Sequence, residues 1–135
     1  MISTTYSSVA TVPFSDQDLD GLLDVSRTSN AARGLTGMLL YRDGRFMQVL
    51  EGPEDAVRST LVRIAADPRH SGVWTLATET IEERAFPDWT MGYRTLTADS
   101  LDGAPGSAAY LSGDAAASWR DATGAKGLLD WFRTH

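Results

Sequence analysis

The chain has 135 residues, a formal net charge of −6 and no cysteine, which is the size of a single domain with its own apolar core. The lack of cysteine excludes disulfides, thiolate nucleophiles and cysteine-ligated metal sites. An acidic chain without a basic run argues against a nucleic-acid-binding surface. We find neither a membrane-spanning apolar run nor a signal-peptide pattern, so we expect a cytoplasmic protein that binds no membrane.

The first predicted elements are a strand and a helix. Residues 2–12 alternate over a β-branched and hydroxyl-rich run, which predicts a strand with Tyr6 and the other even positions on one face. Ser15 is a candidate helix N-cap, Asp18 completes a weak capping box, and Gly34 is a typical helix stop. One helical stripe carries Leu19, Leu22, Leu23, Ser26 and Asn30.

A hairpin is the clearest local signal. Asp43-Gly44 lies between two apolar runs, and Asp-Gly favours a two-residue type I′ turn. Such a turn fixes the register, so that Leu39 faces Gln48 on the opposite strand. Because strand faces alternate, Gln48 then shares an otherwise apolar face, whose other members are Leu39, Tyr41, Phe46 and Leu50.

A second helix and two more strands complete the predicted sheet. The helix begins near Pro53, ends at Asp67-Pro68 and carries an apolar stripe of Val57, Leu61, Ile64 and Ala65. Residues 73–82 and 89–96 have strand patterns. The order β-α-β-β-α-β-β predicts an α+β fold, a ferredoxin-like βαββαββ sheet with both helices on one face.

The remainder of the chain differs in character. Residues 97–114 are rich in small and polar residues and are typical of a connection, whereas 115–123 and 126–133 have the pattern of short C-terminal helices. We therefore divide the chain into a domain at 1–96 and a linker with a helical cap at 97–135. The apolar residues of the segment 126–133 would cover the open face of the sheet or bind a partner.

Three polar side chains fall where the periodicity predicts core: Tyr6, Asn30 and Gln48. Each has an ordinary explanation: a strand tyrosine with its hydroxyl at the sheet edge, a helix-terminal asparagine, and a glutamine bonded to nearby backbone. If the first and third strands are neighbours, however, Tyr6 and Gln48 lie side by side beneath the first helix. A flat heteroaromatic ring could then bind between the helices with its polar edge on these groups.

At these residues the sequence resembles the BLUF family of blue-light sensors that use FAD. The similar stretches follow one another in the expected order and cover roughly residues 2–96: 6–10, 30–41, 44–52, 67–71 and 86–92.

The resemblance implies a role for each polar residue. It makes Tyr6 the photochemical tyrosine, whose neutral phenol can give an electron and a proton to an excited flavin. It makes Gln48 the amide that bridges the phenol to the ring, and Asn30 the holder of the ring's polar edge. Arg69 and His70 would lie near the ring, although without the resemblance a solvated surface charge would be the favoured explanation of Arg69, and His70 is equally ambiguous.

The resemblance also implies a pocket and a relay. The cofactor-binding residues would include Leu22, Ser26, Leu39, Phe46 and Asp67, although core packing or helix capping explains them too. Trp89 and Met91 match the residues that pass the signal to the outer side of the sheet, with simple core packing as the alternative. Ser29, before Asn30, departs from members that carry a bulkier residue there.

The expected function is therefore that of a photoreceptor and not of an enzyme. We expect non-covalently bound FAD, with FMN or riboflavin as substitutes, a separate and unknown downstream protein partner, and a homo-oligomer. The alternative is a flavin-free ferredoxin-like interaction or regulatory module. A small enzyme has less support, because no nucleophile motif, phosphate loop or pair of carboxylates is evident.

Overall fold

The computed structural model describes residues 1–12, 14–42, 44–87 and 90–95. Its elements are β1 (Ile2–Ala10), α1 (Asp16–Arg33), β2 (Thr36–Arg42), β3 (Arg45–Gly52), α2 (Glu54–Ala66), β4 (His70–Thr80) and β5 (Gly92–Thr95). The predicted order of strands and helices is confirmed. Trp89 and the segments predicted beyond residue 96 lie outside the described residues.

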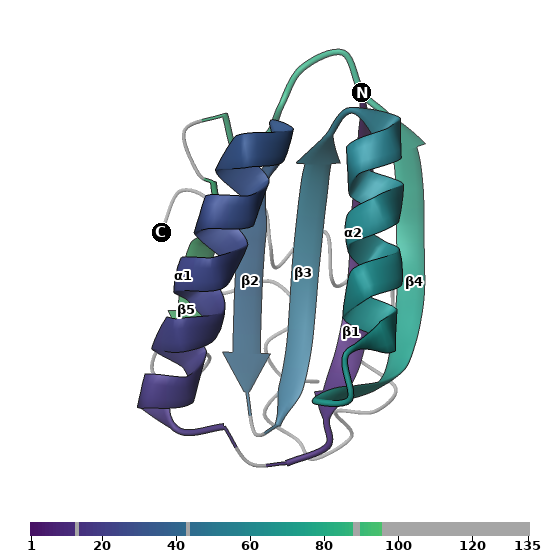
Figure 1. The fold of residues 1–135 in the computed structure, drawn as a ribbon. Coiled ribbons are helices and arrows are strands. Elements are labelled where there is room, and N and C mark those ends of the chain that lie inside the picture. Colours follow the sequence, from purple (N-terminus) through teal and green to yellow (C-terminus); the bar gives the residue numbers. More distant parts are fainter. Residues whose placement is uncertain (13, 43, 88–89, 96–135) are drawn as a thin grey trace, which may run out of the picture.

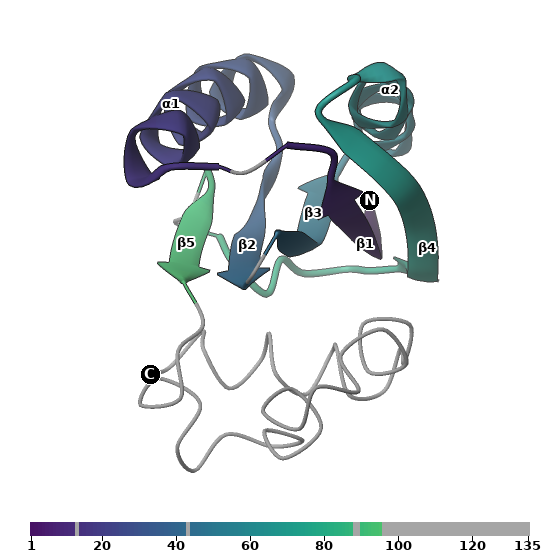
Figure 2. The same ribbon diagram turned by 90° about the horizontal axis from the view of Figure 1, so that it is seen from below.

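The strands form one mixed sheet in the order β4-β1-β3-β2-β5. Neighbouring strands are antiparallel except β2 and β5, which are parallel. Both helices lie on the same face of the sheet (Figures 1 and 2). The ferredoxin-like α+β fold predicted from the sequence is therefore confirmed.

The hairpin register places the central side chains. Leu39 pairs with Gln48 and Tyr41 with Phe46 across β2 and β3, as the two-residue turn predicts. On its other side β3 pairs with β1, where Tyr6 lies directly opposite Gln48. The first and third strands are thus neighbours, and the tyrosine and glutamine share the face beneath the helices.

The first helix begins and ends where the sequence predicts. The Ser15 side chain accepts a hydrogen bond from the Asp18 backbone N–H, while the Asp18 carboxylate accepts from the Ser15 N–H, which makes a complete capping box. At the other end Gly34 has φ 71°, the left-handed conformation that glycine adopts most easily. In the described residues, no helix is long and apolar enough to span a bilayer.

Several predicted boundaries are wrong by a few residues. β1 ends at Ala10 instead of residue 12, β4 runs from His70 to Thr80 instead of 73–82, and residues 90 and 91, which were predicted to lie in the last strand, precede β5 (Gly92–Thr95). In α2 Ala65 is exposed, whereas the polar Thr60 is buried. The shift in β4 matters most, because it places His70 in the sheet beside β1.

The core lies between the sheet and the two helices. Its buried members are Ile2, Tyr6, Leu19, Leu23, Leu35, Leu39, Phe46, Leu50, Val57 and Met91. Tyr6, Asn30 and Gln48 are each at most 5% exposed. The three polar residues picked from the sequence are therefore core residues, and their hydrogen-bonding groups need partners.

Candidate functional site

The centre of the site is a hydrogen bond between two buried side chains of adjacent strands. The Tyr6 hydroxyl donates to Gln48 Oε1. Burial raises the pKa of the Tyr6 phenol well above its ordinary value, because the interior disfavours the charged phenolate. The phenol is therefore protonated at neutral pH and acts as the donor.

The other end of the same amide contacts the segment before β5. Gln48 Nε2 donates to Met91 Sδ at 3.2 Å, and Met91 is 2% exposed. Since a thioether accepts a hydrogen bond only weakly, the amide nitrogen has a weak partner here. Gln48 consequently joins β1 to the entry of β5 through its two chemically different ends.

Asn30 also reaches that segment. It lies near the end of α1, and its Nδ2 donates to the Thr90 carbonyl at 2.8 Å. One turn earlier on the same helix, Arg27 Nε donates to the Met91 carbonyl at 3.0 Å. The last turns of α1 thus hold the backbone that brings Met91 to Gln48.

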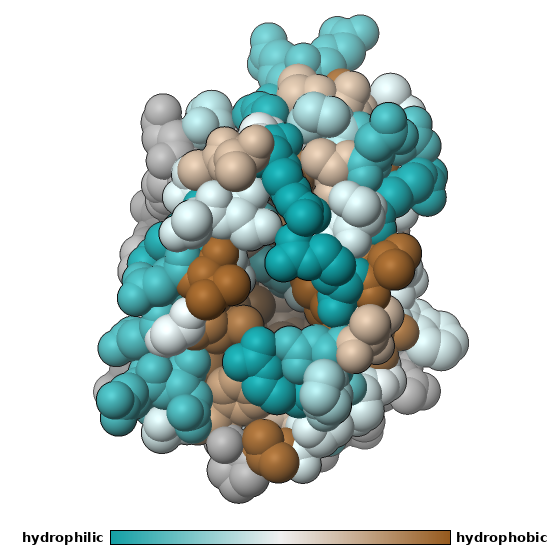
Figure 3. Space-filling view, viewed as in Figure 1, coloured by the Kyte–Doolittle hydropathy of each residue, from teal (hydrophilic) through white to brown (hydrophobic). Residues whose placement is uncertain are grey.

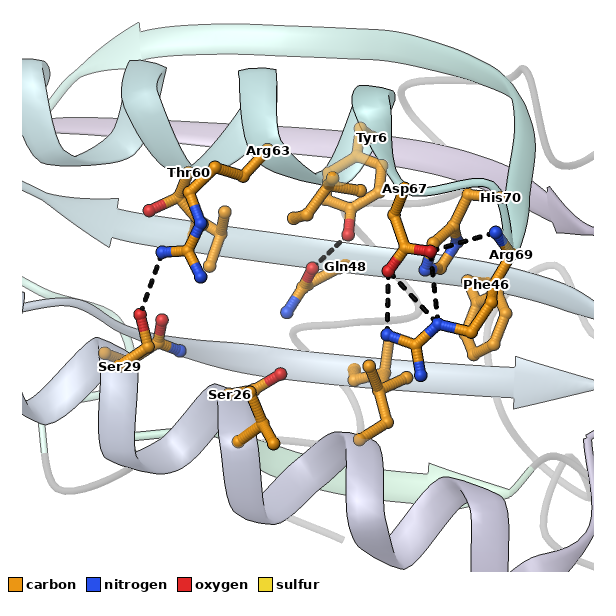
Figure 4. Close-up of a pocket in the computed structure, with 16 residues that line it drawn as sticks. Tyr6, Ser26, Ser29, Phe46, Gln48, Thr60, Arg63, Asp67, Arg69 and His70 are labelled. Carbon is orange, nitrogen blue, oxygen red and sulfur yellow. Dashed lines mark hydrogen bonds and ion pairs between the residues drawn. The ribbon is translucent and has the colours of Figure 1, made fainter.

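A pocket opens between α1 and α2 above these groups (Figure 4). Tyr6 and Gln48 contribute to its floor, and Asn30 lies in its lining. Its apolar lining consists of Leu22, Val25, Leu39, Phe46, Leu50 and Ile64. The space-filling view shows a hollow between the two helices, with hydrophilic residues above and below it and hydrophobic residues on either side (Figure 3).

An ion pair lies at one end of the pocket (Figure 4). Arg69 and Asp67 are linked by Nη2–Oδ2 and Nε–Oδ1 contacts of 2.7 and 3.1 Å. The side-chain bond from Arg69 lowers the pKa of Asp67 to about 2. His70 lies next to them, with its Nδ1 3.0 Å from Ser8 Oγ and its ring 4.9 Å from that of Phe46.

Toward the other end, side chains from each helix form hydrogen bonds to the other helix. Arg63 Nη1 donates to Ser29 Oγ at 3.2 Å, and Figure 4 shows this bond spanning the two helices. Arg33 Nη1 donates to Thr60 Oγ1, also at 3.2 Å. The pocket therefore has an apolar middle with polar groups on its floor and at both ends.

The structure brings together every predicted cofactor-binding residue. The lining includes Asn30, Gln48, Arg69, His70, Leu22, Ser26, Leu39, Phe46 and Asp67. Met91 lies beneath the pocket against Gln48, while Trp89 is outside the described residues. The roles assigned to these residues stay predictions, because the structure gives their positions and not what they bind.

Sequence reasoning missed the contribution of α2. Thr60 and Arg63 line the pocket, although the apolar stripe of that helix gave no reason to select them. Arg27 was missed as well, because it looks like an ordinary exposed arginine. Their one available signal is spacing: Thr60, Arg63 and Asp67 recur at intervals of three and four residues and so share one helix face.

Comparison with known proteins agrees with this geometry. The family model described as "Sensors of blue-light using FAD" (BLUF) matches residues 1–92. The chain is 42% identical over 92 residues to the photoactivated adenylate cyclase subunit beta of Euglena longa, a match that covers 67% of this chain and 11% of that protein. The chain thus spans about a tenth of the length of such curated relatives.

Solved structures extend the similarity over most of the chain. BlrB, a BLUF protein solved in its dark state, has a TM-score of 0.72 and 31% identity over 93% of this chain and 96% of its own. The photo-activated state of BlsA has a TM-score of 0.81 and 25% identity over 99% and 95%. The family match covers more than half of this sequence, and the chain therefore belongs to the BLUF family, the sensors of blue light using FAD.

Proposed function

We propose that this chain senses blue light with a flavin held non-covalently between α1 and α2, and that Tyr6, Gln48 and Met91 convert the absorbed light into a change of hydrogen bonds. One observation carries the proposal. The buried Gln48 amide accepts from Tyr6 at one end and donates to Met91 at the other, directly in the floor of the pocket.

The chemistry of the pocket fits a flavin ring. A flat heteroaromatic ring needs apolar surfaces against its faces and hydrogen-bonding groups along its polar edge. The pocket offers Leu22, Ile64 and Leu39 as apolar surfaces, with the amides of Asn30 and Gln48 as polar groups. When bound, the flavin supplies absorption of blue light and an excited ring that accepts an electron.

The residues of the chain supply the switch. Tyr6 is kept protonated by burial and can release both an electron and a proton. Gln48 can exchange its donor and acceptor ends by rotation or tautomerisation without movement of the backbone. Met91 makes the two orientations unequal, because its sulfur accepts hydrogen bonds but cannot donate one.

The output is part of the proposal. We propose that the signal leaves through the segment entering β5 and is delivered to a separate partner protein in the cytoplasm, with the sensor itself a homo-oligomer without catalytic activity. Support for signalling to an effector comes from relatives named as light-regulated cyclases. In the described residues, no group of three or more His, Asp or Glu is placed to bind a metal.

The test is an absorption spectrum recorded in the dark, during blue illumination and after it. A flavin spectrum that shifts slightly to the red and relaxes in darkness is the expected result. Tyr6→Phe and Gln48→Leu should bind flavin and lose the shift. Tyr41→Phe is the matched control, because that hydroxyl accepts from the Gly44 N–H at 3.1 Å and is not in the pocket lining.

Two other results would contradict the proposal. A colourless protein that takes up no added flavin would favour the alternative hypothesis, a flavin-free interaction or regulatory module. A flavin that bleaches under illumination, without a red shift, would point to redox chemistry in the same pocket.

A further inference from the structure

Two side chains of α1 hold the backbone of the segment that enters β5. Arg27 Nε donates to the Met91 carbonyl at 3.0 Å, and Asn30 Nδ2 donates to the Thr90 carbonyl at 2.8 Å. The two donors are three residues apart and therefore share one face of the helix. Figure 2 shows that β5 lies beneath α1. We call these two hydrogen bonds the α1 clamp.

The clamp holds Met91, the residue that also accepts a hydrogen bond from Gln48. The Met91 carbonyl takes the Arg27 bond, while the Met91 sulfur takes the bond from Gln48 Nε2 at 3.2 Å. A thioether is a weak acceptor and a flexible side chain, whereas a guanidinium makes a charge-assisted bond. The backbone bond is thus the stronger of the two and fixes the position from which the sulfur meets the amide.

Arg27 is separate from the flavin pocket. It does not line the pocket, whereas Asn30 does. It is also exposed overall, so that its replacement removes no core packing. Arg27 is therefore the half of the clamp that can be altered without changing the pocket wall.

We propose that Arg27 is a positioning residue that holds Met91 against Gln48 and thereby sets how quickly the illuminated protein returns to its resting arrangement. This inference rests on the proposed function and adds to it a residue outside the pocket. The clamp stabilises the arrangement in which Gln48 donates to Met91. An arrangement in which Met91 has moved lacks these bonds, and recovery re-forms them by its transition state, so weakening the clamp raises the barrier to recovery.

The variant to test is Arg27→Met, which keeps the length and helix propensity of the side chain and removes the donor. Recovery of the red-shifted spectrum in darkness should slow by about tenfold, the lower end of the effect expected for the loss of one charge-assisted hydrogen bond, because Arg27 is exposed. Arg27→Lys keeps a charged donor without the fixed guanidinium geometry and should recover at an intermediate rate. Arg58→Met is the matched control, since Arg58 lies on α2 and is ion-paired only to Glu54 among the described residues.

A second measurement tests in the dark whether the clamp positions Met91. NMR of ¹³C-methyl-labelled methionine reports Met91 separately, once its signal is assigned with Met91→Leu. In Arg27→Met the Met91 signal should move or broaden in the dark, and the signals of Met38 and Met47 should not. This readout applies equally to the flavin-free protein.

The inference requires both results in Arg27→Met, the slower recovery in darkness and the altered Met91 signal. Recovery at the wild-type rate, or faster, would overturn the inference, as would slower recovery with an unaltered Met91 signal. Failure of the proposed function looks different, because the wild-type protein itself would then show no flavin or no red shift. The Met91 signal would still report in that case whether Arg27 positions this residue.

Discussion

His70, in the lining of the pocket, is a side chain whose protonation can change in mild acid. Its Nδ1 lies 3.0 Å from Ser8 Oγ and its ring packs against Phe46. Burial lowers the pKa of His70, the nearby Asp67 raises it, and Arg69 lowers it. Burial is the largest of these effects, so the imidazole is neutral in the folded protein at pH 7.

A loss of stability in mild acid follows from this shift. Because the pKa of His70 is lower in the folded state than in the unfolded state, its neutral form stabilises the fold above the ordinary pKa near 6.5. That contribution is lost as the pH falls below this value. Thermal unfolding of the flavin-free protein should show a falling Tm below about pH 6.5, and His70→Gln should flatten the curve. An equal fall in that variant would assign the effect to other groups.

For single residues, the sequence predicted which side chains are buried at the site better than it predicted their hydrogen-bond partners. The even spacing of β1 and the two-residue turn predicted the faces that carry Tyr6 and Gln48, and the contact between them followed only if β1 and β3 are neighbours, which the structure shows. The contact of Gln48 with Met91 was not predicted. It depends on the path of the chain between β4 and β5, and no periodic pattern determines that path. The bond from Asn30 to Thr90 was missed for the same reason.

The connection between β4 and β5 is held by a buried carboxyl group of β3. Glu51 is 1% exposed and accepts hydrogen bonds from the backbone N–H groups of Ala85 and Phe86, at 2.9 and 2.6 Å, and from Thr36 Oγ1 at 3.1 Å. Arg84 adds bonds to Thr36 Oγ1 and to the Gly34 carbonyl. The start of this connection is thus anchored to β3, and its end is held by α1.

Glu51→Gln should release that anchor. An amide has one accepting end only, so one of the two backbone N–H groups would lose its acceptor, at a cost of about 1–3 kcal/mol. Denaturant unfolding should show this loss, and hydrogen exchange should show faster exchange at Ala85 and Phe86. Glu54→Gln is the matched control on the exposed face of α2 and should be near wild type. Slow exchange at both amides in Glu51→Gln would contradict the anchor.

Two glycines should respond to alanine in opposite ways. A Cβ on Gly37 would lie 1.9 Å from the Val49 carbonyl oxygen across β2 and β3, whereas one on Gly21 would have nothing within 4 Å. Gly37→Ala should therefore lower the free energy of unfolding by about 3 kcal/mol or more. Gly21→Ala, within α1, should raise it by about 0.5–1 kcal/mol. Similar effects in urea unfolding of the two variants would contradict the close approach at Gly37.

Elements with a strong local signal were predicted well. The hairpin and α1 are determined by a turn, a capping box and a glycine stop, and each acts over a few residues. The ends of β4 and β5 were not determined locally. β4 follows β1 with two register irregularities, and β5 is a four-residue strand that pairs in parallel with β2, so both limits depend on the partner strand.

The pocket lies between the two helices and the sheet (Figure 4), so a ligand bound there would connect all three parts of the described fold. A ligand that binds only the folded state stabilises it by mass action, by about 2.7 kcal/mol at one hundred times its Kd. For a domain of this size, that stabilisation corresponds to a rise in Tm of about 10 °C. Hydrogen exchange should slow in α1 and α2 together.

The same measurement shows which part of the flavin is bound most strongly. Two cationic side chains in the lining are already engaged, Arg63 with Ser29 and Arg69 with Asp67, so we expect the ring to provide most of the affinity. Riboflavin, FMN and FAD should then raise Tm by similar amounts at equal ligand concentration, with Kd values within about tenfold of one another. Ser26→Trp, which fills the lining from α1, should keep the flavin-free Tm and remove the response. A much tighter Kd for FAD than for riboflavin would mean that the phosphates displace one of these bonds and pair with the freed arginine.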